Sequence, residues 1–386
     1  METQKYDDIR PFRDEELPEV ITRLLKDPRF CAILPFLAQD MSVEALKEQL
    51  RQLKTINEFQ VKIMHMLLRN VAKKSTDSLD LSGFKYLDKS KSYTFVSNHR
   101  DIILDSAFLD ILLIEKNMET FEIAIGDNLL AYPWISDVVR INKSFLVKRG
   151  LPVRQQLGAS IELSSYMHYT ISERNQSIWI AQREGRAKDA DDRTQESVLK
   201  MLNLGGSGSV LENLASMNIV PVSISYEYDP CDYLKAREMQ LKRDNPDYRK
   251  TQKDDIENMQ TGLMGYKGRV FYKVSPCISD ELIKMEVGMH KNELFEKVAK
   301  LMDNRIHRNY HLYPGNYVAA DLLDGLDRFS NSYSATERDR FIDYLKQQLD
   351  KIELKNKDED FLRKRMLEMY SNPLKNKLEA ESGIGY

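Results

Sequence analysis

A short polar segment, Ser97-Asn-His-Arg-Asp-Ile-Ile-Leu-Asp105, holds the residues best suited to proton transfer. It follows an apolar run and precedes a helical pattern. We therefore expect His99 on a strand-to-helix loop at the carboxyl edge of a sheet, where open α/β sheets bind their ligands. A histidine titrates near neutral pH and can accept the proton of an attacking hydroxyl. A carboxylate beside it would orient the imidazole and stabilise its charged form.

Three further segments follow at ordered intervals, and two of them carry cations just beyond an apolar run. They are Gly126-Asp-Asn-Leu, leading to Phe145-Leu-Val-Lys-Arg149; Arg183-Glu-Gly-Arg-Ala-Lys188; and Ile219–Tyr226, with Pro221 early in an apolar run. Guanidinium groups bind phosphate oxygens through paired hydrogen bonds, so cations at strand ends favour a phosphate site. A glycine at position 185 would let the backbone approach a ligand closely. Taken singly, each cation is as well explained by ordinary surface charge.

The elements that must position these residues alternate between strand and helix. Short apolar, β-branched or aromatic runs predict strands at 93–97, 121–125, 145–147, 177–181, 219–226 and 268–274. Helical patterns lie between them at 105–113 and 153–172. This alternation is typical of an α/β fold with a largely parallel, mixed sheet flanked by helices.

The two ends of the chain read as helical. Apolar residues recur at helical spacing before residue 80, and amphipathic patterns occupy 284–302, 336–356 and 361–369. We therefore expect an N-terminal helical region at 1–85, an α/β domain at 86–280 and a C-terminal helical region at 281–386.

Composition excludes several classes of function. The chain has 57 Lys and Arg against 60 Asp and Glu, a net charge of −3, which disfavours nucleic acid as a partner. The 3 cysteines are far apart, so neither a disulfide framework nor a zinc site is expected. His307 and His311 lack the adjacent Glu of a zinc helix, and no metal or cofactor is implied. The Gly205-Gly-Ser-Gly-Ser run lacks the Lys of a phosphate-binding loop and is expected to be a turn.

No run approaches the roughly 20 apolar residues that span a bilayer. The longest candidate, Ile102–Ile114, contains Asp105 and Asp110. The N-terminus is polar and acidic, unlike a secretory signal. The expected location is the cytoplasm, with contact at most to a membrane surface, on its inner face.

Together the four segments resemble the glycerolipid acyltransferases, which include glycerol-3-phosphate and lysophosphatidic acid acyltransferases. That family has four blocks in fixed order. Their counterparts here are Asn98, His99 and Asp105; Gly126 to Arg149; Glu184, Gly185 and Arg186; and Val220-Pro-Val222. The resemblance covers residues 86 to 275. Gly126-Asp-Asn-Leu and Ser223-Ile-Ser-Tyr226 are closer to the glycerol-3-phosphate branch.

The resemblance implies an O-acyltransferase of phospholipid biosynthesis without a cofactor. Its donor would be an acyl thioester of acyl carrier protein or coenzyme A, and its acceptor the hydroxyl of glycerol-3-phosphate. His99 would be the general base. Arg149, Arg186 and Lys188 would bind the acceptor phosphate, and Glu184 and Gly185 would shape the acceptor site.

Two departures from the family pattern leave alternatives open. Five residues separate His99 from Asp105, where the family has four. Asp105 is the expected partner because it opens a helical pattern, and Asp101 is the alternative. Arg183 stands where an aromatic residue or proline often precedes Glu-Gly in the family. This departure concerns the specificity for the acceptor more than the type of reaction. The rival functions are acylation of 1-acylglycerol-3-phosphate or another lipid head group, and an inactive membrane-surface scaffold with the same fold.

Overall fold

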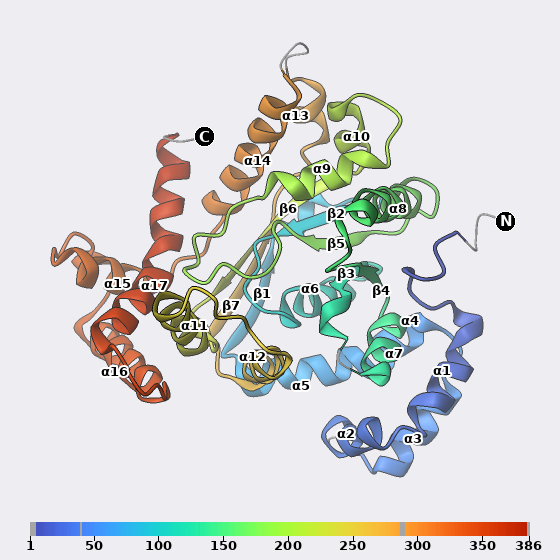
Figure 1. The fold of residues 1–386 in the computed structure, drawn as a ribbon, viewed down its shortest axis with the longest axis horizontal. Helices are drawn as coiled ribbons and strands as arrows, with labels where there is room; N and C mark the ends of the chain where they lie inside the picture. The colour runs from blue at the N-terminus through green and yellow to red at the C-terminus, as the bar shows by residue number, and fades with distance from the viewer. Residues whose placement is uncertain (1–4, 39–40, 131, 286–289, 384–386) are drawn as a thin grey trace.

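The computed structural model describes residues 5–38, 41–130, 132–285 and 290–383. At its centre is a seven-stranded sheet in the order β1-β7-β6-β2-β5-β3-β4 (Figure 1). The strands are β1 (Ser78–Ser82), β2 (Thr94–Ser97), β3 (Glu122–Gly126), β4 (Ser144–Val147), β5 (Ile178–Ala181), β6 (Ile219–Tyr226) and β7 (Arg269–Val274). Neighbouring strands are parallel except β6 and β7. The predicted class, a largely parallel mixed sheet flanked by helices, is confirmed.

Helices cover both faces of the sheet and extend from its two ends. In the N-terminal half they are α1 (Leu17–Leu24), α2 (Pro28–Ala38), α3 (Val43–Gln52), α4 (Ile56–Glu58), α5 (His65–Ser75), α6 (Leu104–Ile114), α7 (Pro133–Ile141) and α8 (Val153–Ser172). After β5 they are α9 (Glu196–Leu204), α10 (Val210–Ser216), α11 (Asp232–Asp244), α12 (Gln252–Met264), α13 (Ser279–Ile283), α14 (Lys291–Arg308), α15 (Pro314–Asp324), α16 (Ala335–Asp350) and α17 (Glu359–Ser382).

Successive side chains of the central strands point to opposite faces, as strand geometry requires. On β2, Val96 joins a core with α8, α9, α10 and α14, whereas Phe95 joins a core with α5 and α6. On β5, Ile178 and Ile180 face the first core and Trp179 the second. Burial on both faces explains why these strands are apolar throughout and do not alternate with polar residues.

All six predicted strands are present, but the prediction of helix up to residue 80 is wrong at its end. Residues 78–82 form β1, which pairs in parallel with β7 at one edge of the sheet. Leu79 and Leu81 pack against the core that contains Phe95. The alternation in Ser-Leu-Asp-Leu-Ser spans only five residues, which gives a weak strand pattern beside a strong helix.

The C-terminal helices differ in length from the predictions. The pattern at 284–302 corresponds to α14, which begins at Lys291; residues 286–289 of this prediction lie outside the described part of the chain. Helix α16 ends at Asp350, short of residue 356. Helix α17 continues past 369 to Ser382 with Pro373 inside it, and the buried Leu374 and Ala380 hold this extension against the rest of the molecule.

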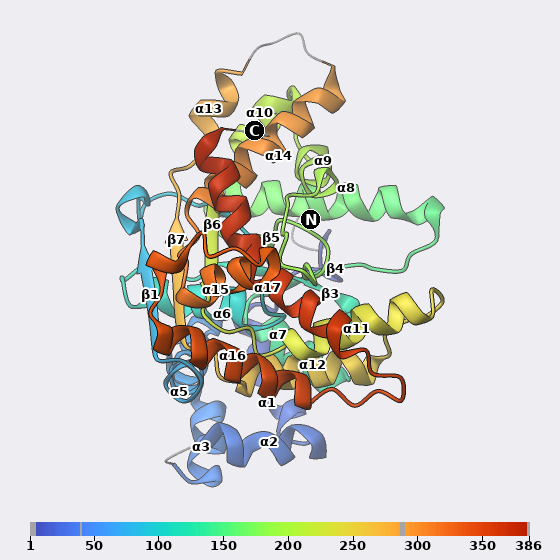
Figure 2. The same cartoon turned by 90° about the vertical axis from the view of Figure 1, so that its left-hand side faces the viewer.

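Figure 2 shows α15, α16 and α17 stacked along one side of the sheet, with α1, α2 and α3 at another end. The N-terminal helices share a core with α7. The C-terminal helices share one with Tyr228 and Ala236, beyond the end of β6. None of the helices among the described residues is long and apolar enough to cross a bilayer.

Candidate active site

His99 lies on the loop between β2 and α6, as the sequence predicts. Asn98 fixes the start of this loop. Its side-chain amide donates to the carbonyl of Ile224 at 3.0 Å and accepts from the Ile224 amide at 2.8 Å. These two bonds continue the pairing of β2 with β6 after the backbone ladder has ended at Ser97. The loop therefore leaves the sheet in a fixed direction.

The carboxylate that contacts the histidine belongs to Asp105. His99 Nδ1 lies 2.9 Å from Asp105 Oδ2, and the amide of Arg100 donates to the same oxygen at 2.7 Å. Asp101 instead accepts the amides of Ile103 and Leu104 at 2.8 Å each. Asp101 thus satisfies free amides at the start of α6, while Asp105, in the first turn, points back to the imidazole.

The contact with Asp105 determines which imidazole nitrogen of His99 carries the hydrogen. An ionised carboxylate only accepts hydrogen bonds, so Nδ1 carries the hydrogen and Nε2 keeps a lone pair. Burial raises the pKa of Asp105, and the His99 contact opposes that rise. The Trp179 ring meets the His99 ring edge-on at 6.3 Å between centroids. With its side chain only 14% exposed, His99 can act as a base in a largely dry environment.

A second carboxylate, not predicted from the sequence, holds the His99 backbone. Asp192, on the loop between β5 and α9, accepts the His99 amide at 2.6 Å. Its side chain is 2% exposed. The pair is 93 residues apart in sequence, and no local pattern could have indicated it. The β5–α9 loop therefore holds the backbone of His99, while Asp105 holds its imidazole.

The predicted phosphate ligands each pair with a different group. Arg149, on the loop after β4, contacts Glu184 at 2.7 Å. Lys188 contacts Glu238 on α11 at 2.8 Å. Burial lowers the pKa of Lys188 to about 8, against the opposing effect of Glu238. Glu184, expected to shape the acceptor site, thus forms an ion pair with Arg149 in this structure.

Arg186 is the most buried of the three, with an exposed fraction of 7%. One guanidinium nitrogen, Nη2, donates to Asn258 on α12 at 2.8 Å, whereas Nη1 is buried with no partner among the described residues. A buried donor without a partner costs free energy, about 1–3 kcal/mol, and more for a charged group. Such a nitrogen is available to an anion.

Gly185 has φ of +67°, a conformation that side-chain-bearing residues rarely adopt. A Cβ there would meet no other part of the protein within 4 Å, so the backbone conformation by itself favours glycine at this position. Two segments of the protein approach each other closely at a different glycine, Gly262 on α12. A Cβ at Gly262 would lie 2.1 Å from Asp101 Oδ2. Glycine here lets α12 pack against the loop that carries His99.

Arg186 belongs to a group of four largely buried cations, which we name the basic cluster: Arg100, Arg186, Lys235 and Lys267. Asp229 joins them, at 2.5 Å from Lys235 Nζ and 3.4 Å from Arg100 Nη2. Burial raises the pKa of Asp229, but Lys235 and Arg100 outweigh it and hold the value at about 2. Asp101 is the other carboxylate that interacts with Arg186 and Lys267.

The four cations interact with three buried carboxylates: Asp101, Asp229 and, through Arg100, Asp192. Arg100 Nε, like Arg186 Nη1, is buried with no partner among the described residues. Burial lowers the pKa of Lys267 to about 8. Buried donors are normally paired, so the partnerless guanidinium nitrogens of Arg100 and Arg186 favour an anionic ligand. No local pattern indicated Arg100 beyond its place after His99.

The C-terminal helices support this cluster. Tyr370 on α17 donates to Asp232 Oδ2 at 2.7 Å, and its hydroxyl accepts the amide of Asp229 at 3.0 Å. Tyr344 and Gln348 on α16 donate to the same Asp232 at 2.7 Å each. This network ties α16 and α17 to the loop after β6. A region without a sequence motif thus fixes Asp229 and, through it, Arg100.

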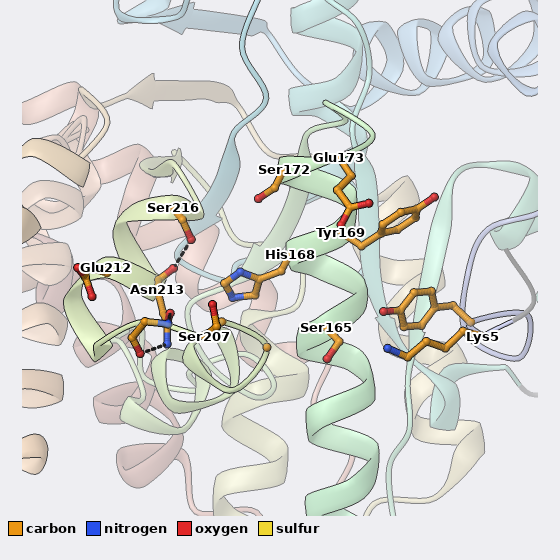
Figure 3. A pocket seen from close by; sticks show the side chains of 14 residues that line it. Lys5, Ser165, His168, Tyr169, Ser172, Glu173, Ser207, Glu212, Asn213 and Ser216 are labelled. Atoms are coloured by element: carbon orange, nitrogen blue, oxygen red, sulfur yellow. Dashed lines mark hydrogen bonds between the residues drawn. The ribbon is translucent and has the colours of Figure 1, made fainter. Parts of the chain in front are cut away.

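A separate cavity of about 570 Å³ lies away from this site (Figure 3). In Figure 3, Ser165 and His168 on α8 face Ser207, Asn213 and Ser216 across it. Helix α8 precedes β5 and helix α10 precedes β6, so the cavity lies near the amino ends of these two strands. His99 lies near their carboxyl ends, at the opposite edge of the sheet. The cavity is therefore not part of the site around His99.

The Gly205-Gly-Ser-Gly-Ser run lines this cavity and connects α9 to α10, a turn between helices as expected. Among the described residues, no group of three or more His, Cys, Asp or Glu side chains could hold a metal ion. His307 lies in the last turn of α14, with Nε2 at 2.9 Å from the Asp192 carbonyl, and His311 lies beyond the helix.

Comparisons with known proteins found matches to this chain. Residues 78–225 match the family model described as Acyltransferase. A search of curated proteins found no significant match. A solved structure that matches is the 1-acyl-sn-glycerophosphate (LPA) acyltransferase PlsC from Thermotoga maritima, with 13% identity and a TM-score of 0.34. The match covers 75% of this chain and 93% of that one. The matched residues 78–225, which contain His99, Asp105 and Arg186, are thus similar to an acyltransferase domain, and this supports an acyltransferase activity for the chain.

Proposed function

We propose that this enzyme transfers a fatty acyl group from an acyl thioester, carried by acyl carrier protein or coenzyme A, to a hydroxyl of glycerol-3-phosphate. The observation that carries the proposal is the 2.9 Å contact of His99 with Asp105, with Arg100 of the buried basic cluster as the next residue in the chain. A base and an anion site side by side suit an acceptor that has both a hydroxyl and a phosphate.

In the proposed reaction, the acceptor hydroxyl gives its proton to His99 Nε2 as its oxygen attacks the thioester carbonyl. The C–S bond breaks when the tetrahedral intermediate collapses, and the thiolate takes the proton back from the imidazolium. Asp105 stabilises the charged imidazole between these steps. General-base catalysis of this kind contributes about 100- to 10,000-fold in rate.

Arg100 and Arg186 are the proposed ligands of the acceptor phosphate, because each has a buried nitrogen without a partner among the described residues. Binding phosphate would satisfy these donors and offset the positive charge of the basic cluster. Arg149 and Lys188 already have carboxylate partners, so they are proposed to complete the site only by exchanging those partners for substrate.

Product analysis tests the function. Purified protein is supplied with glycerol-3-phosphate or 1-acylglycerol-3-phosphate, each with acyl carrier protein and coenzyme A thioesters, and the lipids are identified by mass spectrometry. We expect 1-acylglycerol-3-phosphate as the product of the first acceptor. Formation of phosphatidic acid alone, from the acylated acceptor, would instead assign the chain to the second step of acylation.

Replacing Arg186 by alanine is expected to raise KM for glycerol-3-phosphate about 10- to 100-fold, since a charge-assisted hydrogen bond contributes about 1.5–3 kcal/mol. Steady-state kinetics with the acceptor varied measures the change. Arg186→Lys keeps the charge and should recover part of the affinity. Arg193→Ala, on the same loop but 43% exposed, is the matched control and should leave KM within about twofold. An unchanged KM in Arg186→Ala would remove this residue from the phosphate site.

A further inference from the structure

The amino-terminal half of α8 exposes three large aliphatic side chains along one stripe. Val153, Leu157 and Ile161 are 83%, 63% and 43% exposed. Their spacing of four residues places them on one side of the helix. We name them the α8 stripe. Single exposed aliphatic residues are ordinary on a protein surface, but three aligned on one helix form a continuous apolar surface.

The two halves of α8 have different surroundings. Its carboxyl half carries Leu163, Tyr166 and Met167, which are buried in the core above the sheet. Its first turns extend away from the body of the molecule (Figure 2). Exposure falls from Val153 to Ile161 as the helix approaches that body. The α8 stripe is therefore a projection and cannot be a wall of a groove.

The charge around the stripe is low. From residue 150 to residue 161 the only ionisable side chain is Arg154, and the other polar residues are uncharged. The two preceding cations are already paired, Lys148 with Asp8 and Glu162, and Arg149 with Glu184. Arg154 forms no ion pair with the described residues. An apolar projection with one cation and no carboxylate can enter a lipid interface without burying a negative charge.

We propose that the α8 stripe inserts into a phospholipid bilayer and docks the enzyme on it. An acidic carrier protein is the weaker candidate, because such a partner requires several free cations and the stripe offers only Arg154. A fluid bilayer, in contrast, accepts a convex apolar surface without a matching groove. The proposal rests on the proposed function only in that the product is a lipid.

The position of α8 gives docking a consequence for the reaction. The helix begins after the carboxyl end of β4, on the same edge of the sheet as the His99 loop. Arg149, four residues before Val153, contacts Glu184 on the loop after β5. Insertion of the stripe therefore holds the edge of the sheet that carries His99 against the bilayer, where an acyl product leaves the aqueous phase.

Flotation with vesicles tests the docking without turnover. The full-length protein is mixed with vesicles of phosphatidylethanolamine and phosphatidylglycerol, and the triple variant Val153→Gln, Leu157→Gln, Ile161→Gln is compared with it. Glutamine keeps helix propensity while removing the apolar surface. We expect the wild type to float with the vesicles and the variant to bind at least about tenfold more weakly. The matched control, Ile256→Gln, Ile283→Gln, Leu378→Gln, removes three exposed aliphatic residues elsewhere and should bind like the wild type.

The failure of this proposal is distinguishable from failure of the proposed function. Acylation of glycerol-3-phosphate by a short-chain thioester without vesicles should be equal in the triple variant and the wild type. Equal flotation of the two proteins, or no flotation of the wild type, would overturn docking through α8 whatever the activity. Unchanged flotation with a lower rate only for acyl carrier protein thioesters would assign the stripe to the carrier protein instead.

Discussion

Replacement of His99 by alanine is expected to lower kcat by about 100- to 10,000-fold, because the variant has no group to accept the proton of the attacking hydroxyl. The loop around it should survive. Asn98 still bonds to Ile224, and the backbone amide of residue 99 can still donate to Asp192. The measurement is single-turnover or saturating steady-state acyl transfer, with the product quantified.

Two controls separate loss of chemistry from loss of structure. The unfolding temperature of His99→Ala should lie within a few degrees of the wild type, because Asp105 keeps the Arg100 amide as a donor after losing the imidazole and the loss of packing against Trp179 is small. His65→Ala, which removes a partly exposed histidine from α5, should retain nearly full activity. A His99→Ala enzyme that keeps more than about a tenth of wild-type kcat would show that another group acts as the base.

The second large effect is expected from Asp105→Asn. The asparagine side chain is neutral and cannot stabilise the imidazolium, and its amide nitrogen can hold the ring in the wrong tautomer. We expect kcat to fall by about 100- to 10,000-fold with KM for glycerol-3-phosphate little changed. Steady-state kinetics on the purified variant, with both substrates varied, gives the two constants separately.

Comparison with Asp101→Asn shows which of the two carboxylates orients His99. Asparagine can also accept the amides of Ile103 and Leu104, so the start of α6 should be retained at a cost of up to about 1 kcal/mol. We expect a fall in kcat of less than about tenfold, arising from the changed charge near Arg186. If instead Asp101→Asn abolished turnover and Asp105→Asn did not, the orienting role would belong to Asp101.

The buried basic cluster explains why the C-terminal helices belong to the enzyme. Tyr370 reaches both Asp229 and Asp232, and Asp229 contacts Arg100, the residue after the candidate base. A polar network that is satisfied in this way fixes the position of each member. The helices beyond residue 290 therefore support the site even though the Acyltransferase match ends at residue 225.

Local patterns in the sequence determined the elements of this protein. Helix α8 begins and ends at Val153 and Ser172, as its helical pattern predicts, and each apolar run predicted as a strand is one. The position of His99 on a β–α loop followed from its neighbours alone. These features depend on interactions within a few residues, so one sequence is enough to predict them.

Only the tertiary structure decided which groups meet. Arg186 contacts Asn258, 72 residues later, and His99 contacts Asp192, 93 residues later. The reversed direction of β7 and the edge strand β1 likewise depend on pairing between distant segments. The choice of Asp105 over Asp101 depends on how the first turn of α6 directs each carboxylate. Hydrogen bonds and charges act through space, and a linear pattern does not record the distances between segments that folding brings together.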